Sequence, residues 1–297
     1  MTRPIAKPPS KKWRYISLVS LLIIGGGVYF WLYNTSSDPV FEGKRENAWL
    51  KSIERWDGDP QDPAFRAFQH MGTNALPRLL AAVGGKDVGL SRSIMKVNQA
   101  QSLVSLPGGE PWKKEMAAAW AIYFMGTNAL PALPALTNML FHTNALVSCT
   151  TALAGIGSDA VPALLRATTS QDFTIRLAAL SGLSLERARQ EQVVPVVMER
   201  LADSNMLVRV EAIQCLGELH LFPQLVVPAL ITNSDSQDTL VRMATFAALS
   251  KFGTNAASAL PKVLAACKDP NQDVREAAQY ALSQIQSDPQ SRKPANQ

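Results

Sequence analysis

The feature that most constrains this chain is a 33-residue period in its C-terminal half. Three kinds of residue return at that spacing: an Asp or Asn, an Arg, and a Pro. They are Asp172, Asn205, Asp238 and Asn271; Arg176, Arg209, Arg242 and Arg275; and Pro162, Pro195, Pro228 and Pro261. A period between 20 and 50 residues is typical of proteins built from stacked repeats. The period therefore predicts a row of equivalent units.

Local chemistry predicts that each unit is a pair of helices. Asp and Asn accept hydrogen bonds from the free N–H groups of a first helical turn, so the first column predicts an N-cap. Apolar residues then follow at helical spacing. After Asp238 these are Val241, Ala244, Ala248, Leu249 and Phe252. A Pro lacks only an N–H that a first turn does not use, so the Pro column predicts the start of a second helix.

A turn that begins with Gly joins the two helices. It occurs at residues 72–77, 126–131 and 157–162, and in a longer form at 253–261. Gly is expected to end the first helix, and the following Thr, Asn, Ser or Asp to cap the second.

A column of small residues predicts close contact between successive units. It contains Gly182, Cys215, Ala248 and Ala281, and small side chains let helices approach to roughly 8–10 Å. Together, the helix pair, the Pro, the Ala-rich faces and the Asp or Asn followed by Val-Arg resemble the HEAT repeat in its short bacterial form. The resemblance spans Pro63 to Ser287 and is weaker before Asp172, where Leu146 replaces the Arg. It implies an all-α fold, an α-solenoid of about six stacked antiparallel helix pairs.

Composition agrees with a solenoid and argues against a nucleic-acid partner. The chain is 47% hydrophobic and only 7% aromatic, and its formal charge is +5. All of the excess lies in five basic residues before Asp38, because the remaining basic and acidic residues balance. Nucleic-acid binding needs clustered Lys and Arg on the folded body, so we expect none.

The N-terminal region predicts a membrane anchor. Residues 16–33 hold no charge, and Trp13 to Tyr33 would span about 31 Å as a helix, close to the bilayer's apolar thickness. Aromatic residues lie at both ends, and the Lys and Arg before the span favour a cytoplasmic N-terminus. A cleaved signal peptide is the alternative, although Thr35 and Ser37 offer a poor cleavage site. No Cys follows the apolar run, which argues against a lipoprotein.

These signals divide the chain into five segments, one of which contains an insertion. We predict a basic cytoplasmic tail (1–14), a transmembrane helix (15–33), a linker with a helix at Glu46 to Trp56 that covers the open end of the stack (34–62), the solenoid (63–287), an insertion within it (84–112), and a polar tail (288–297). The stretch from Phe41 to Leu50 also resembles one found after the anchor of bacterial membrane-anchored HEAT-repeat proteins. That resemblance implies a single-pass protein of the bacterial inner membrane with a periplasmic solenoid.

The insertion is the one irregular surface of the predicted solenoid. Insertions in solenoids fall on one face, which is often the binding face. Its exposed-looking turn, which includes Pro107, Glu110 and Trp112, is therefore a candidate binding loop. The alternative is a variable loop with no partner.

The recurring Arg needs an explanation, because a cation in the first turn of a helix opposes the helix dipole. A structural ladder, in which each Arg meets a carboxylate or the C-terminal carbonyls of a neighbouring helix, is one hypothesis. A row of anion-binding sites is the other.

Residues typical of catalysis or metal binding do not form a known pattern. Cys149, Cys215 and Cys267 lack metal-ligand spacing, and we expect them to be buried small residues. His70, His142 and His220 stand alone. The glycine pattern at 155–160 lies between two helices and not after a strand, which argues against a dinucleotide site. We therefore predict no enzyme activity, no cofactor and no metal.

These observations favour a membrane-anchored scaffold or adaptor that binds another protein. A partner-dependent subunit of a membrane-associated enzyme and a binder of cell-envelope polymer are the alternatives. Some HEAT-like families are named after lyases that attach bilin chromophores, but no residue here beyond the repeat supports that activity. The sequence does not fix the oligomeric state.

Overall fold

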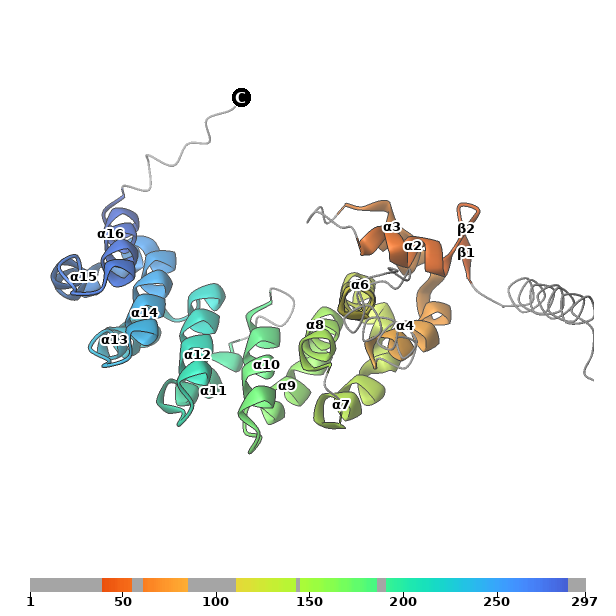
Figure 1. Cartoon of the computed structure of the whole chain (residues 1–297), viewed down its shortest axis with the longest axis horizontal. Coiled ribbons are helices and arrows are strands. Elements are labelled where there is room, and N and C mark those ends of the chain that lie inside the picture. Colours follow the sequence, from red (N-terminus) through yellow and green to blue (C-terminus); the bar gives the residue numbers. More distant parts are fainter. Residues whose placement is uncertain (1–38, 55–60, 85–110, 143–144, 186–190, 288–297) are drawn as a thin grey trace, which may run out of the picture. The chain divides into compact units, whose positions relative to one another are not determined.

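The computed structural model describes residues 39–54, 61–84, 111–142, 145–185 and 191–287, which form helices and turns apart from one small β-hairpin (Figure 1). The α-helices are α2 Glu46–Ile53, α3 Pro63–Met71, α4 Leu76–Val83, α6 Pro111–Met125, α7 Leu133–His142, α8 Leu146–Ile156, α9 Val161–Ala167, α10 Phe173–Ser184, α11 Val193–Glu199, α12 Met206–Leu219, α13 Pro223–Asn233, α14 Thr239–Phe252, α15 Leu260–Ala266 and α16 Gln272–Gln286. The predicted all-helical class is confirmed.

Helices α3 to α15 form pairs, and α16 follows as a first helix without a second. The first helices α6, α8, α10, α12, α14 and α16 each contact the next one in the series. The second helices α7, α9, α11, α13 and α15 pack against the first helix of the following pair. Each pair thus buries its apolar side against its neighbours, as stacked repeats must. This arrangement confirms the predicted solenoid of stacked helix pairs.

Glycine ends four of the first helices, as the turn motif predicted. Gly72, Gly126, Gly157 and Gly253 have φ of 57°, 61°, 90° and 52°, values that strain a residue with a Cβ. The prediction that polar turn residues cap the second helices was wrong. The turns are 3-10 helices (η1 Gly72–Ala75, η2 Gly126–Ala132, η3 Ser158–Ala160 and η6 Gly253–Ala259) that run directly into the next helix, and no side-chain cap bond accompanies them.

One second helix begins earlier than the Pro column predicted. Pro162, Pro195 and Pro261 lie in the first turns of α9, α11 and α15, but Pro228 lies inside α13. The cause is a different turn, in which Phe222 takes a left-handed conformation and Pro223 occupies the first helical position. Pro is pre-organised for that position, so α13 starts five residues before Pro228.

The small column lies in the core, where successive first helices meet. Gly182, Cys215, Ala248 and Ala281 are all buried. A Cβ added to Gly182 would come within 2.9 Å of the Thr150 Cβ on α8. The size of these residues therefore sets how closely the helices pack.

A β-hairpin and a short helix precede the first pair. Strands β1 Val40–Phe41 and β2 Lys44–Arg45 pair antiparallel around a turn with positive φ at Glu42 and Gly43, the geometry that favours tight hairpins. Helix α2 buries Trp49, Leu50 and Ile53 and packs against α3 and α6. We expected a plain linker before this helix, and the hairpin is an addition to that expectation.

Several predicted segments lie outside the described residues. They are the basic tail, the transmembrane helix at 15–33, Trp56, the insertion up to residue 110, and the polar tail from residue 288. Among the helices of the described part of the chain, none has both the length and the apolar character needed to cross a membrane. The anchor stays a prediction.

Candidate functional site

The Asp and Asn column caps first helices with one exception. The side chains of Asp172, Asn205 and Asn271 accept hydrogen bonds from backbone N–H groups in the first turns of α10, α12 and α16. Asp238 occupies the same position before α14 but makes no such bond. Its Oδ2 lies 2.5 Å from Nη2 of Arg209 instead.

Each recurring Arg ties a turn of its own repeat together. The Nη1 groups donate to two carbonyl oxygens in the turn just before the Arg's own helix, at 2.7–3.3 Å. The carbonyls belong to Ser170 and Gln171, Asp203 and Ser204, Ser236 and Gln237, and Asp269 and Pro270. A guanidinium thereby satisfies backbone groups that a turn leaves open.

Three of the four arginines also hold a carboxylate of the following repeat. Arg176 and Arg242 make two-pronged pairs with Asp203 and Asp269, at 2.7–3.1 Å. Arg209 makes a single bond to Asp238. Hydrogen bonds from Arg242, together with the N–H of Asn271, lower the pKa of Asp269. These contacts favour the structural ladder over a row of anion-binding sites, because the guanidinium groups are already occupied within the protein.

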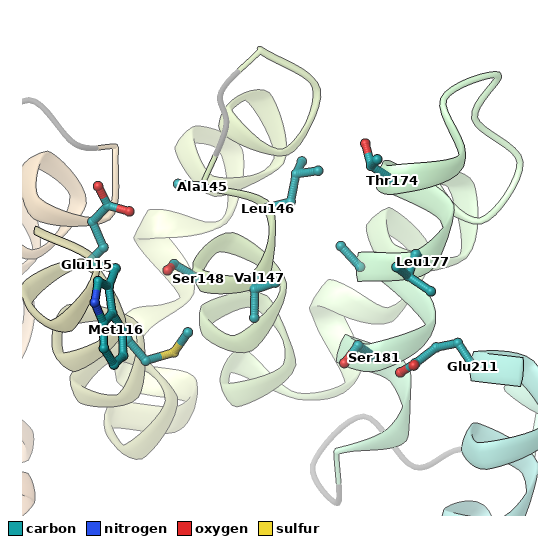
Figure 2. A pocket seen from close by; sticks show the side chains of 12 residues that line it. Glu115, Met116, Ala145, Leu146, Val147, Ser148, Thr174, Leu177, Ser181 and Glu211 are labelled. Atoms are coloured by element: carbon teal, nitrogen blue, oxygen red, sulfur yellow. The ribbon is translucent and has the colours of Figure 1, made fainter. Parts of the chain in front are cut away.

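A pocket of about 470 Å³ lies on the first helices α6, α8, α10 and α12 (Figure 2). Its lining is Trp112, Glu115, Met116, Ala145, Leu146, Val147, Ser148, Thr174, Leu177, Ala178, Ser181 and Glu211. Leu146 and Val147 on α8 lie between Met116 on α6 and Leu177 on α10 (Figure 2). We call this pocket the groove. Its size is that of a site for a ligand or a few side chains of a partner.

The groove includes one residue of the predicted binding loop. Trp112, 60% exposed, lines it from the first turn of α6. We expected this residue in an irregular turn, but the helix already begins at Pro111, where Pro is well suited to a first turn. Pro107 and Glu110 lie outside the described residues.

The groove is one part of a longer apolar row that the sequence analysis did not identify. Met116, Val147 and Leu177 line it, and Val210 and Met243 follow Leu177 at the same 33-residue spacing on α12 and α14. Val147 is 54% exposed, and the other four are half-buried. We call these five residues the apolar row. The 33-residue spacing is a usable signal, but apolar residues at helical spacing predict a buried stripe and do not reveal its partly exposed edge.

Glu211 is one of two charged residues that line the groove, the other being Glu115 on α6. Glu211 reaches from α12 back toward Ser181 on α10 (Figure 2). Burial raises the pKa of the Glu211 carboxyl, and a hydrogen bond from the Ser181 hydroxyl opposes this in part. The side chain forms no ion pair within the described residues, so a cation that enters the groove would meet a carboxylate without a counter-charge.

The cysteines and histidines form no reactive cluster in the described part of the chain. Cys149 and Cys215 are buried as expected, whereas Cys267 is half-buried at the end of α15. Burial, and to a smaller degree the charge of Glu211, raise the pKa of the Cys215 thiol, which keeps it protonated and unreactive. No group of His, Cys, Asp and Glu there could hold a metal ion.

Comparison with known proteins identifies the repeat. The family model described as HEAT repeats matches residues 161–250 and again 194–283, two matches offset by the 33-residue period. Residues 161–283 are thus HEAT repeats. No curated protein sequence matches the chain.

Solved structures with a similar helical fold come from proteins of different kinds. One is the complex of CpcE and CpcF of phycocyanin lyase from Nostoc sp. PCC7120, with 20% identity, a TM-score of 0.46, and coverage of 51% of this chain and 98% of that chain. A second is a mutant of Kap121p, with 15% identity, a TM-score of 0.46, and coverage of 80% and 29%. A third is human deoxyhypusine hydroxylase in complex with glycerol, with 18% identity, a TM-score of 0.37, and coverage of 81% and 96%. The likeness concerns the fold alone.

Proposed function

We propose that this chain, whose residues 161–283 are HEAT repeats, is a membrane-anchored scaffold that binds another protein along its first helices. In this proposal residues 15–33 anchor it in the inner membrane of a bacterium, the N-terminus stays in the cytoplasm, and the solenoid faces the periplasm. The chain itself catalyses no reaction.

The observation that carries the binding role is the apolar row with its groove. Side chains at Met116, Val147, Leu177, Val210 and Met243 lie on successive first helices and leave part of their apolar surface exposed, although four of them also pack against the core. Exposed apolar surface that forms a contiguous feature marks interaction sites more often than single exposed residues do. A partner segment laid along the row would cover it.

Site-specific photo-crosslinking in cells tests this role. A photoreactive amino acid replaces Val147 in the full chain, and a matched variant carries it at Leu225, which is 49% exposed on the second helix α13. We expect a discrete protein adduct from position 147 and none from position 225. Equal adducts at both positions, or none at position 147, would contradict the proposal.

The composition of the adduct separates the alternatives. A protein band that mass spectrometry assigns to one partner supports a scaffold, and an enzyme as that partner would make the chain its subunit. An adduct that resists protease but is degraded by a muramidase would favour the envelope-polymer alternative.

The anchor needs its own test, because it rests on the sequence alone. We expect the full chain to remain in the membrane fraction after a high-salt or carbonate wash, and a protease added to the periplasmic side to digest the solenoid. The apparent mass of the mature chain distinguishes the anchor from a cleaved signal peptide. A soluble chain that lacks its first 35 or so residues would show that the segment is removed.

A further inference from the structure

Glu211 breaks the pattern of its own column. The equivalent positions in the other repeats, 33 residues apart, hold Ala178, Ala244 and Ala277. Ala178 and Ala244 are buried, and Ala277 is half-buried. Packing at this position therefore favours a small residue, and the repeat fold does not require a carboxylate there.

The surroundings of Glu211 make its charge costly and leave it without a counter-charge. Its carboxyl is half-buried, it accepts a hydrogen bond from Ser181, and it has no ion pair within the described residues. The charged side chains that line the groove are Glu115 and Glu211, both acidic. A group that brings positive charge into the groove would relieve this desolvated carboxylate.

We propose that the groove binds an extended polypeptide segment of the partner in which a Lys or Arg lies beside apolar side chains, with the cation held by Glu211. This inference rests on the proposed scaffold function and names the chemistry of the partner. The apolar side chains pack against Met116, Val147 and Leu177, and the ammonium or guanidinium group meets the carboxylate.

The apolar row favours a polypeptide over a small amine. The row continues beyond the groove to Val210 on α12 and Met243 on α14, and Leu207 and Leu240 are exposed in the first turns of the same helices. A small ligand would fill the groove and leave this surface in water. A chain with apolar side chains at intervals covers both.

Selection from a random dodecapeptide display library, with the full chain in detergent micelles as bait, tests the proposal. We expect the selected peptides to be enriched in Lys or Arg next to apolar residues. Their binding to Glu211→Ala should be at least roughly 30-fold weaker, the loss typical of removing one partner of a desolvated charge pair. The control Glu199→Ala removes an exposed carboxylate on the second helix α11 and should leave the affinity unchanged.

Folding does not confound this comparison, because Ala already occupies the equivalent position in three repeats. A charge reversal, Glu211→Lys, should select peptides enriched in Asp or Glu instead. Peptides without basic enrichment, equal affinity for wild type and Glu211→Ala, or a library that yields no binder would each overturn the proposal.

The failure of this inference is distinguishable from that of the scaffold function. If the adduct at position 147 forms equally in wild type and in Glu211→Ala, the scaffold stands and the cation-binding role of Glu211 is overturned. If position 147 forms no adduct, the scaffold function fails as well.

Discussion

Arg176 on α10 donates two hydrogen bonds to the carboxylate of Asp203 in the following repeat, one to each carboxylate oxygen. Nε lies 2.8 Å from Oδ2 and Nη2 lies 2.7 Å from Oδ1, and the two side chains are only 11% and 5% exposed. The same guanidinium donates to the carbonyls of Ser170 and Gln171. One side chain therefore fixes a turn of its own repeat and the distance to the next.

Loss of this guanidinium should destabilise the solenoid. Arg176→Met keeps the apolar stem but leaves two carbonyls without this donor and the shielded Asp203 carboxylate with the N–H of Asn205 in place of a cation. We expect a loss of about 2 kcal/mol or more in the free energy of unfolding, measured by urea denaturation. Lys262→Met is the matched control, because it removes a pair with Asp235 that is exposed on both sides and should cost under about 1 kcal/mol. Equal effects of the two substitutions would refute the structural ladder.

The other rungs should differ in strength according to their geometry. Arg242 holds Asp269 with two bonds, and both side chains are shielded, whereas Arg209 makes one bond to Asp238, which is 42% exposed. We therefore expect Arg242→Met to lower the melting temperature more than Arg209→Met. The reverse order would mean that the pairs to carboxylates contribute little and that the carbonyl contacts dominate.

The pairs with carboxylates also predict a loss of stability in acid. The Arg242 hydrogen bonds lower the pKa of Asp269 below its ordinary value of 3.8. The folded chain then binds fewer protons than the unfolded one, so this contribution is complete above about pH 5 and is lost as the pH falls through the lowered pKa. We expect the difference in melting temperature between wild type and Arg242→Met to shrink between about pH 5 and about pH 2. A difference that stays constant would exclude the carboxylate as its source.

Local signals predicted the repeat well because caps, glycines and apolar spacing act within one helix pair. Contacts between pairs were harder to predict. Asp238 stands in the capping column, yet its carboxylate pairs with Arg209. In two other repeats an Asp two positions before the cap makes this pair, Asp203 before Asn205 and Asp269 before Asn271. The residue two positions before Asp238 is a Ser, so Asp238 itself pairs with the Arg. Choosing between a cap and a pair requires knowing which groups neighbouring repeats bring together.

The groove shows a different limit of the sequence. Its apolar side chains follow the same helical spacing as the core, and periodicity alone does not tell which flank of a helix is covered. One residue of the groove does stand out in the sequence: Glu211 occupies a column that otherwise holds Ala178, Ala244 and Ala277. The capping, Arg, Pro and small columns define the repeat, and Glu211 belongs to none of them.

Close approach of α6 and α8 makes Gly155 a sensitive position. A Cβ built there would lie 2.0 Å from Cα and 2.7 Å from Cβ of Tyr123, so the backbones would have to separate. We expect Gly155→Ala to cost about 3 kcal/mol or to prevent folding of this part of the stack, at or above the usual range for overpacking. Gly84→Ala is the control, because its nearest contacts are at 3.3 Å and one is the flexible end of Met139. Circular-dichroism melts of both variants measure the difference, and similar melting temperatures would contradict the geometry.

If Glu211 serves binding and not folding, its half-buried charge should lower the free energy of unfolding of the chain. Burial raises the pKa of its carboxyl above the ordinary 4.5, so in the interval between the two values the folded chain binds more protons than the unfolded one. Stability of the wild type then falls as the pH rises through that interval, and the penalty is complete above the raised pKa. At about pH 8 we expect the free energy of unfolding of Glu211→Ala, measured by urea denaturation, to exceed that of wild type by up to about 1 kcal/mol. This difference should become smaller as the pH falls toward 4.5. The control Glu199→Ala should show no such gain. A variant less stable than wild type at every pH would mean that Glu211 serves the fold, and the carboxylate would then need a structural explanation.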